Sequence, residues 1–277
     1  RMEFSEKTFT SQANFHLTGI VPIAGQSLDF NLSYPDCMLA IAPNYTLLDA
    51  AIVECAYAGC DTIWVVCNDD IAPIVRYSVG DYIEDPMYFY NTSTRTSDTR
   101  RRVPIFWVPI HPKDRDKRDC LSWSVIQGAL SALKVTSQIS KWMIPDKYYV
   151  SFPYGYFNPD QIWKSRRDIR TEKNFYVASD GKTIQDNLYT SFTFGKDEFV
   201  KYRRNGRKGT GEYSMEEVDE RGIPRSRLPI EERWSARFFE LDQVFYDLDL
   251  NDANLVDVEY ANVGSWSEYR SFMGSEI

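Results

Sequence analysis

The chain has little of what several classes of protein require. It contains two histidines in 277 residues, His16 and His111, and neither has a cysteine or a second histidine at zinc-ligand spacing. Its five cysteines are odd in number, and no two of them form a Cys-x-x-Cys pair. The sequence therefore argues against a zinc site and predicts reduced, structural thiols.

Long apolar runs and an excess of positive charge are also lacking. No run approaches the roughly 20 apolar residues that span a bilayer, and the first residues do not have the charged-then-apolar order of a signal peptide. We therefore expect no membrane partner and a cytoplasmic location. The net charge of −8 disfavours nucleic acid as a partner. The basic clusters at 100–102 and 201–208 are local, so an exposed face or a protein contact is favoured there over nucleic acid.

The segment from residue 20 to residue 68 carries the most informative pattern. An apolar run that starts at Ile20 enters a turn at Gly25, and a second apolar run covers 62–67. Between them, apolar residues recur at three- and four-residue spacing over 47–58, and Gly59 follows where a helix would end. This is a βαβ unit, the start of a parallel sheet. Because ligands bind at the carboxyl ends of such strands, we expect the chemistry at the Gly25 turn.

Later segments continue the alternation of strands and helices. Helices are predicted at 71–82 and 121–133, strands at 103–110 and 148–152, and a loop at 112–118. The segment 103–110 contains prolines, so either this strand lies at an edge of the sheet or the prolines lie at its ends. This order indicates an α/β sheet.

Beyond residue 160 the pattern changes to short alternating runs separated by turns. These runs predict antiparallel strands at 174–178, 188–194 and 199–202, followed by a mobile loop over 203–232. Residues 237–245 and 254–273 regain apolar periodicity and should rejoin the main sheet. With this amount of hydrophobic sequence we expect a single domain over 1–277, in which 165–232 form an insertion or mobile subdomain.

Two segments resemble a known family. Pro35-Asp-Cys-Met-Leu-Ala-Ile41, with the helix and strand after it, and Tyr260-Ala-Asn-Val-Gly-Ser-Trp-Ser-Glu-Tyr269 are similar to the opening and closing motifs of sugar-1-phosphate nucleotidyltransferases. The resemblance implies a three-layer nucleotide-diphospho-sugar transferase sheet (GT-A-like, Rossmann-like) with an antiparallel insertion. It also implies transfer of a nucleoside monophosphate from a triphosphate to a phosphorylated sugar or similar small molecule, with Mg²⁺ as cofactor. A nucleotide or nucleotide sugar would be the partner, and an oligomer is possible.

The resemblance also assigns residues to a site. The backbone of Ala24, Gly25, Gln26, Ser27 and Leu28 would cradle phosphates. The family's phosphate-gripping Arg and Lys are replaced here by Asp29 and Asp36, which should oppose triphosphate binding. The base-recognition loop would correspond to Arg118, Asp119 and Cys120, although Asp119 is favoured as a helix N-cap. The metal-binding aspartates would correspond to Tyr154, with Asp160 nearby, and to Asn262.

Three functional interpretations fit this pattern. The enzyme is active, with cations supplied by the residues after the 103–110 strand, namely Lys113, Arg115, Lys117 and Arg118. Alternatively, the same pocket binds a nucleotide or nucleotide sugar without transfer. In the third interpretation the fold has become a structural or interaction module, because fold does not determine function.

Overall fold

The computed structural model describes residues 15–24, 30, 32–86, 101–115, 120–215, 221–224 and 241–275. Its centre is an eight-stranded sheet in the order β11-β9-β10-β7-β1-β4-β6-β5. The strands are β1 (Leu17–Pro22), β4 (Thr62–Val66), β5 (Tyr82–Glu84), β6 (Arg102–Val108), β7 (Lys147–Val150), β9 (Phe175–Ala178), β10 (Phe192–Gly195) and β11 (Asn254–Asp257). Two small sheets pair β2 (Ala40–Ala42) with β3 (Tyr45–Thr46) and β8 (Gly155–Tyr156) with β12 (Ala261–Asn262).

The central strands are parallel, and antiparallel pairs lie toward both edges. β1 pairs in parallel with β4 and β7, and β4 pairs in parallel with β6. β10 runs antiparallel to β7 and β9, and β5 runs antiparallel to β6. β11 lies parallel to β9, so the C-terminal part of the chain rejoins the main sheet as the sequence predicted.

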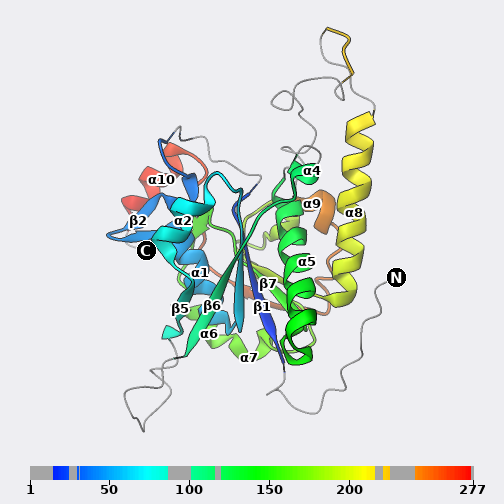
Figure 1. Cartoon of the computed structure of the whole chain (residues 1–277). Helices are drawn as coiled ribbons and strands as arrows, with labels where there is room; N and C mark the ends of the chain where they lie inside the picture. The colour runs from blue at the N-terminus through cyan, green and yellow to red at the C-terminus, as the bar shows by residue number, and fades with distance from the viewer. Residues whose placement is uncertain are drawn as a thin grey trace.

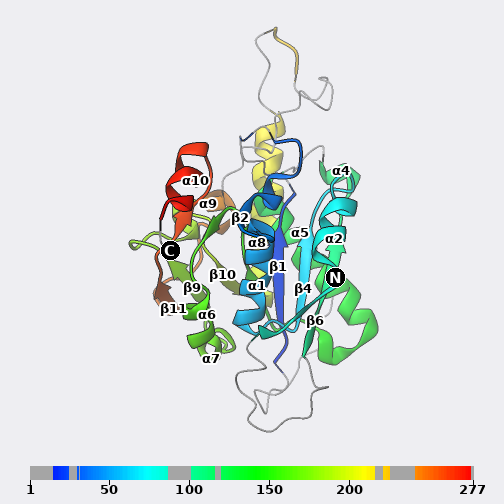
Figure 2. The same ribbon diagram turned by 90° about the vertical axis from the view of Figure 1, so that its left-hand side faces the viewer.

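Helices cover both faces of the sheet, which makes a three-layer α/β fold (Figure 1). The described helices are α1 (Leu47–Ala58), α2 (Ala72–Val79), α4 (Pro112–Arg115), α5 (Leu121–Ile139), α6 (Asp160–Lys164), α7 (Arg166–Ile169), α8 (Lys196–Met215), α9 (Leu241–Phe245) and α10 (Trp266–Met273). Short 3₁₀ turns occupy Asp36–Met38, Lys141–Met143 and Ile184–Asp186. α5 and α8 lie on one face and α1 on the other, the face turned to the viewer in Figure 2. No helix in the described ranges is long and apolar enough to cross a membrane.

Alternate side chains of the central strands supply two cores. Ile20, Trp64 and Tyr148 pack on the α5 side, whereas their neighbours Val21 and Val65 pack on the α1 side. β1, β4 and β7 are buried along their whole length, as expected for parallel strands that are covered on both faces. All five cysteines are buried free thiols, which confirms the prediction made from their number and spacing.

Local sequence determines both ends of α1. Thr46 and Asp49 form a reciprocal capping box at its start, and Gly59 ends it with a φ of 87°. Each end therefore has partners for backbone groups that the helix itself leaves unpaired. The helix has the bounds that the sequence predicted, and it feeds β4 to complete the βαβ unit.

Four predictions of local structure were wrong. The predicted strand at 199–202 and the first part of the predicted loop at 203–232 belong to α8, whose buried Phe199 and Tyr202 have helical spacing. The predicted helix at 71–82 ends at Val79, and Tyr82 starts β5. The predicted loop at 112–118 begins with the helical turn α4.

Of the two alternatives predicted for β6, the edge position is excluded, because β5 lies outside it in the sheet. Its Pro104 is tolerated near the start of the strand. There it faces Tyr82 of β5, one residue before the described pairing with β4 begins at Ile105. The other predicted alternative, in which the prolines lie near the ends of the strand, is confirmed.

Candidate functional site

The carboxyl ends of the parallel strands meet the amino terminus of α5. Ala24 follows β1, is buried, and donates its N–H to the carbonyl of Val66 at the end of β4 (3.0 Å). Its own carbonyl accepts a hydrogen bond from the hydroxyl of Ser124 in the first turn of α5 (2.6 Å). Ala24 is therefore held against the start of α5, at the edge where ligands bind in open α/β sheets.

The N-cap residue of α5 does not cap the helix with its side chain. Its N-cap residue is the buried Cys120, not Asp119 as predicted, and the Cys120 side chain makes no capping hydrogen bond. Two residues on, the hydroxyl of Ser122 is fully buried and has no hydrogen-bond partner in the part of the chain that the structure describes, which does not include Asp119. A buried hydroxyl without a partner costs about 1–3 kcal/mol. The amino end of this 19-residue helix thus has unmet capacity to hold an acceptor or an anion.

Several residues of the predicted phosphate and base site cannot be placed. Gly25, Gln26, Ser27, Leu28, Asp29, Arg118 and Asp119 lie outside the described residues. Of the nucleotide-site residues, Ala24, Asp36 and Cys120 are described. Ala24 and Cys120 lie at the α5 start, and Asp36 begins the 3₁₀ turn that precedes β2.

The residues predicted to hold a metal are partly brought together. Asn262 of β12 lies opposite Gly155 of β8, and the N–H of Val263 donates to the carbonyl of Tyr154 (3.1 Å). Asp36 acts electrostatically on Tyr154 as well. Asp160 is exposed at the start of α6, where its N–H donates to the side chain of Asn158 (3.0 Å).

The side chains of Tyr154 and Asn262 are poor ligands for magnesium. Burial raises the pKa of Tyr154 well above its ordinary value, so its phenol stays neutral. The amide of Asn262 donates to Glu268 (3.2 Å), which also accepts from Gly264 and Ser265 and is thereby engaged at the start of α10. No group of three or more His, Cys, Asp or Glu side chains in the described part of the chain could hold a metal ion.

Basic side chains follow β6 at the same edge. Lys113 and Arg115 lie on α4, and the guanidinium of Arg115 is 3.9 Å from the carboxylate of Asp70. His111 is exposed, and its ring nitrogen Nδ1 accepts the N–H of Lys113 (3.2 Å). His111 therefore supports the start of α4, while the two cations remain candidates for phosphate contacts.

The sequence did not lead us to one buried carboxyl group, that of Glu54. Glu54 lies on α1 and accepts hydrogen bonds from Tyr149 (2.6 Å), Ser151 (2.8 Å) and Ser191. Burial raises the pKa of Glu54 to about 7, although the three hydroxyl donors lower it. A signal was present, because Glu54 falls on the apolar stripe of the helix, seven residues after Leu47 and four before Ala58.

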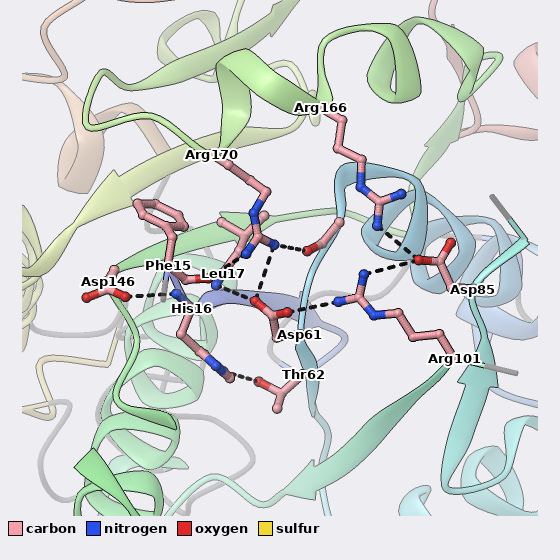
Figure 3. Close-up of polar contacts among 11 residues, drawn as sticks. Phe15, His16, Leu17, Asp61, Thr62, Asp85, Arg101, Asp146, Arg166 and Arg170 are labelled. Carbon is pink, nitrogen blue, oxygen red and sulfur yellow. Dashed lines mark hydrogen bonds and ion pairs between the residues drawn. The ribbon is translucent and has the colours of Figure 1, made fainter. Parts of the chain in front are cut away.

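The opposite end of the sheet carries a network of ion pairs (Figure 3). Asp61, just before β4, accepts from the N–H of Leu17 (2.9 Å) and pairs with Arg101 (2.8 Å) and Arg170 (3.3 Å). Asp85, whose side chain is 2% exposed, bridges Arg101 (3.3 Å) and Arg166 (2.9 Å). We call these five charged residues the amino-end cluster.

The amino-end cluster joins segments that are distant in sequence. Arg170 also donates to the carbonyl of Gly59 at the end of α1 (2.6 Å), where the helix dipole favours a cation. Arg166 packs over Gly59 so closely that an added Cβ would overlap its guanidinium. The network therefore ties α1 and α7 to the starts of β1, β4 and β6.

Comparisons with known proteins support the fold. The sequence matches no protein-family model and no curated protein. The structure is similar to the UTP-bound UGPase from Acinetobacter baumannii, with a TM-score of 0.54, 12% identity, and coverage of 94% of this chain and 92% of that one. It is also similar to a putative glucose-1-phosphate thymidylyltransferase from Bacillus anthracis in complex with sucrose, with a TM-score of 0.52, 9% identity, and coverage of 93% and 94%. The chain therefore has the fold of sugar nucleotidyltransferases.

A weaker likeness involves a metal-bound protein. Rv0371c from Mycobacterium tuberculosis in complex with manganese matches with a TM-score of 0.46 and 13% identity, over 94% of this chain and 99% of that one. That similarity is too low to transfer its metal chemistry to this chain.

Proposed function

We propose that this chain binds a nucleotide or a nucleotide sugar at the carboxyl edge of its sheet. The observation that carries the proposal is the start of α5, which is held against Ala24. Its N-cap residue makes no side-chain capping hydrogen bond, and Ser122 has no hydrogen-bond partner among the described residues. Phosphate groups bind at such helix termini through backbone N–H groups and the helix dipole. The fold shared with nucleotidyltransferases supports the same location.

Nucleotidyl transfer is the second candidate function. Lys113 and Arg115 favour it, since they place positive charge at the carboxyl end of β6 where phosphoryl groups would need it. The side chains at the predicted metal positions, Tyr154 and Asn262, disfavour nucleotidyl transfer, because neither supplies the carboxylate that magnesium prefers. Binding without transfer is therefore the function that the described residues support best.

A ligand titration tests binding. We expect one of the four common nucleoside triphosphates, or a nucleotide sugar made from it, to raise the melting temperature of the full chain. A ligand at 100 times its dissociation constant adds about 2.7 kcal/mol of stability, which is readily measured. If none of them raises the melting temperature, with or without magnesium, the proposal fails.

Two substitutions at Cys120 locate the site. In Cys120→Ser the new hydroxyl can accept from first-turn N–H groups, so it competes with a phosphate for the same donors. A cap worth about 1 kcal/mol should weaken nucleotide binding roughly fivefold. Cys120→Ala offers no acceptor and should bind as the native chain does. Equal affinities in the two variants would place the nucleotide elsewhere.

A product assay separates binding from transfer. The nucleotide that binds is incubated with magnesium and a panel of sugar phosphates, and pyrophosphate release is measured. No release is expected if the chain only binds. Turnover with one sugar phosphate would establish the second candidate function instead.

A further inference from the structure

The carboxyl group of Glu54 has hydroxyl partners but no cation. The residue is 7% exposed, and its oxygens accept from Tyr149, Ser151 and Ser191. Within the part of the chain that the structure describes, no basic side chain forms an ion pair with it. Buried carboxylates are normally paired with a positive charge, so this group is incompletely matched.

Glu54 lines a narrow pocket on the α1 side of the sheet. The pocket is bordered by α1 and by the segment around β8, and it encloses about 340 Å³ including its open mouth. Its closed part admits an occupant about the size of a water molecule. Four tyrosines with partly exposed rings share the lining: Tyr45, Tyr156, Tyr189 and Tyr260.

A second oxygen in this pocket is also unmatched. The hydroxyl of Tyr260 is buried and has no hydrogen-bond partner in the described structure. Gly155 leaves room for it, because a Cβ there would overlap that hydroxyl and lie 2.7 Å from the carbonyl oxygen of Ala261. The pocket therefore places a carboxylate and a phenol oxygen, both able to accept hydrogen bonds, around a space of atomic size.

We propose that this pocket binds an ammonium group, with Glu54 as its counter-charge and Tyr260 as a hydrogen-bond acceptor. An ammonium group carries only donors and has about the size of water, so it complements the unmatched acceptors. The faces of the tyrosine rings attract cations as well. The group belongs either to a free ammonium ion or to the end of a small primary amine. No residue of α5 lines the pocket, so the proposal does not depend on nucleotide binding at the start of that helix.

Ionisation of the surrounding groups agrees with this assignment. Burial raises the pKa of Glu54 to about 7, so it titrates near neutrality. Burial also raises the pKa values of Tyr45, Tyr149 and Tyr260, so these phenols stay neutral there. Two further carboxyl groups act electrostatically on the pocket tyrosines from outside, Asp160 on Tyr156 and Glu268 on Tyr260, and acidic groups at these positions favour a cation.

Salt-specific melting temperatures test the proposal on the full chain. At about pH 8, ammonium chloride should raise the melting temperature by several degrees relative to sodium chloride at equal concentration, whereas the larger tetramethylammonium ion should not. Stabilisation by ammonium alone assigns the site to the free ion, and additional stabilisation by methylammonium or ethanolamine assigns it to an amine. The ammonium effect should shrink at about pH 6. Equal effects of all the salts would overturn the proposal.

Matched variants connect the effect to the pocket. Glu54→Gln keeps the shape of the side chain and one acceptor oxygen but removes its charge and replaces the other oxygen with an NH₂ donor, and should abolish the ammonium effect. Tyr260→Phe should weaken the effect, whereas Tyr77→Phe, on a side chain that is 92% exposed, should leave it intact. An ammonium effect that persists in Glu54→Gln would refute the assignment.

A direct measurement covers the case in which Glu54→Gln does not fold. Crystals of the native chain are soaked with thallium(I), a monovalent ion of similar size to ammonium that scatters anomalously. An anomalous peak between Glu54 and Tyr260 is expected, and soaking with excess ammonium should remove it. Thallium bound only at other positions would overturn the proposal.

Discussion

Two sets of polar side chains, near opposite ends of the parallel strands, differ in how completely they are paired. At the amino ends, Asp61 and Asp85 each contact two arginines, and every member of the amino-end cluster has an oppositely charged partner. Toward the carboxyl ends, the hydroxyl of Ser122 has no hydrogen-bond partner and the carboxyl of Glu54 no paired cation among the described residues. The charges of the amino-end cluster are thus all paired, whereas Ser122 and Glu54 are incompletely matched.

This difference separates stability from binding. A satisfied network holds elements together but has no remaining capacity for a ligand. Unmatched buried groups cost stability, and Ser122 and Glu54 lie toward the edge where α/β folds bind ligands. We therefore expect substitutions at the amino end to change stability, and substitutions toward the carboxyl end to change ligand or proton binding.

Removing Asp85 should have the largest effect on stability. Asp85→Ala leaves Arg101 and Arg166 without their shared carboxylate in a buried setting. We expect a loss of about 3 kcal/mol, the lower end for broken buried pairs, because both guanidinium groups are partly exposed. Urea denaturation of the native chain and the variant measures this loss.

A nearby exposed pair provides the control for Asp85. Asp81 and Arg76 are 2.7 Å apart, and their side chains are 59% and 58% exposed. Asp81→Ala should leave the urea midpoint within experimental error, because solvent screens such pairs. Equal losses in the two variants would contradict the structural role assigned to the amino-end cluster.

The pH dependence of stability tests the unmatched carboxyl group. The pKa of Glu54 in the folded chain, about 7, lies above its ordinary value of 4.5, so the folded state binds the proton more tightly than the unfolded state. Stability should therefore fall as the pH rises from about 4.5 to about 7, by roughly 3 kcal/mol from this group. Denaturation across this range should show the decline in the native chain relative to Glu54→Gln.

A second variant sharpens the test at Glu54. Tyr149→Phe removes one of the hydroxyl donors that lower the pKa of Glu54, so the decline should extend to higher pH. If the native chain and Glu54→Gln have parallel pH profiles, the carboxyl group does not titrate in this range. The ammonium proposal would then lose its link to ionisation.

Much of this fold could be predicted because its signals are local. The bounds of α1 follow from apolar spacing and from Gly59, and the buried runs of β1 and β4 identify the parallel sheet. The 199–202 segment was misassigned because Phe199 and Tyr202 are three residues apart in a run too short to separate helix from strand. α8 becomes evident only over its full length.

The unmatched groups could not be predicted, because each depends on neighbours that are distant in sequence. The donors to Glu54 are Tyr149 of β7, Ser151 just after that strand, and Ser191, all more than 90 residues away. Ser122 and Ser124 are two residues apart on one helix, and the sequence alone does not show which hydroxyl has a hydrogen-bond partner. The edge of the sheet that carries the candidate site was predictable, whereas its chemistry required the tertiary structure.

These two serines give the finest test of the comparison. Both are buried in the first turn of α5, but the Ser124 hydroxyl donates to Ala24 and the Ser122 hydroxyl has no partner. Ser124→Ala should lower stability by about 1 kcal/mol, because it removes the hydrogen bond to Ala24. Ser122→Ala should raise stability by a similar amount, because it removes a buried hydroxyl without a described partner and alanine favours the helix. Urea midpoints measured side by side should therefore move in opposite directions. Two losses of equal size would mean that Ser122 has a partner in solution, and the start of α5 would then not be available to a phosphate.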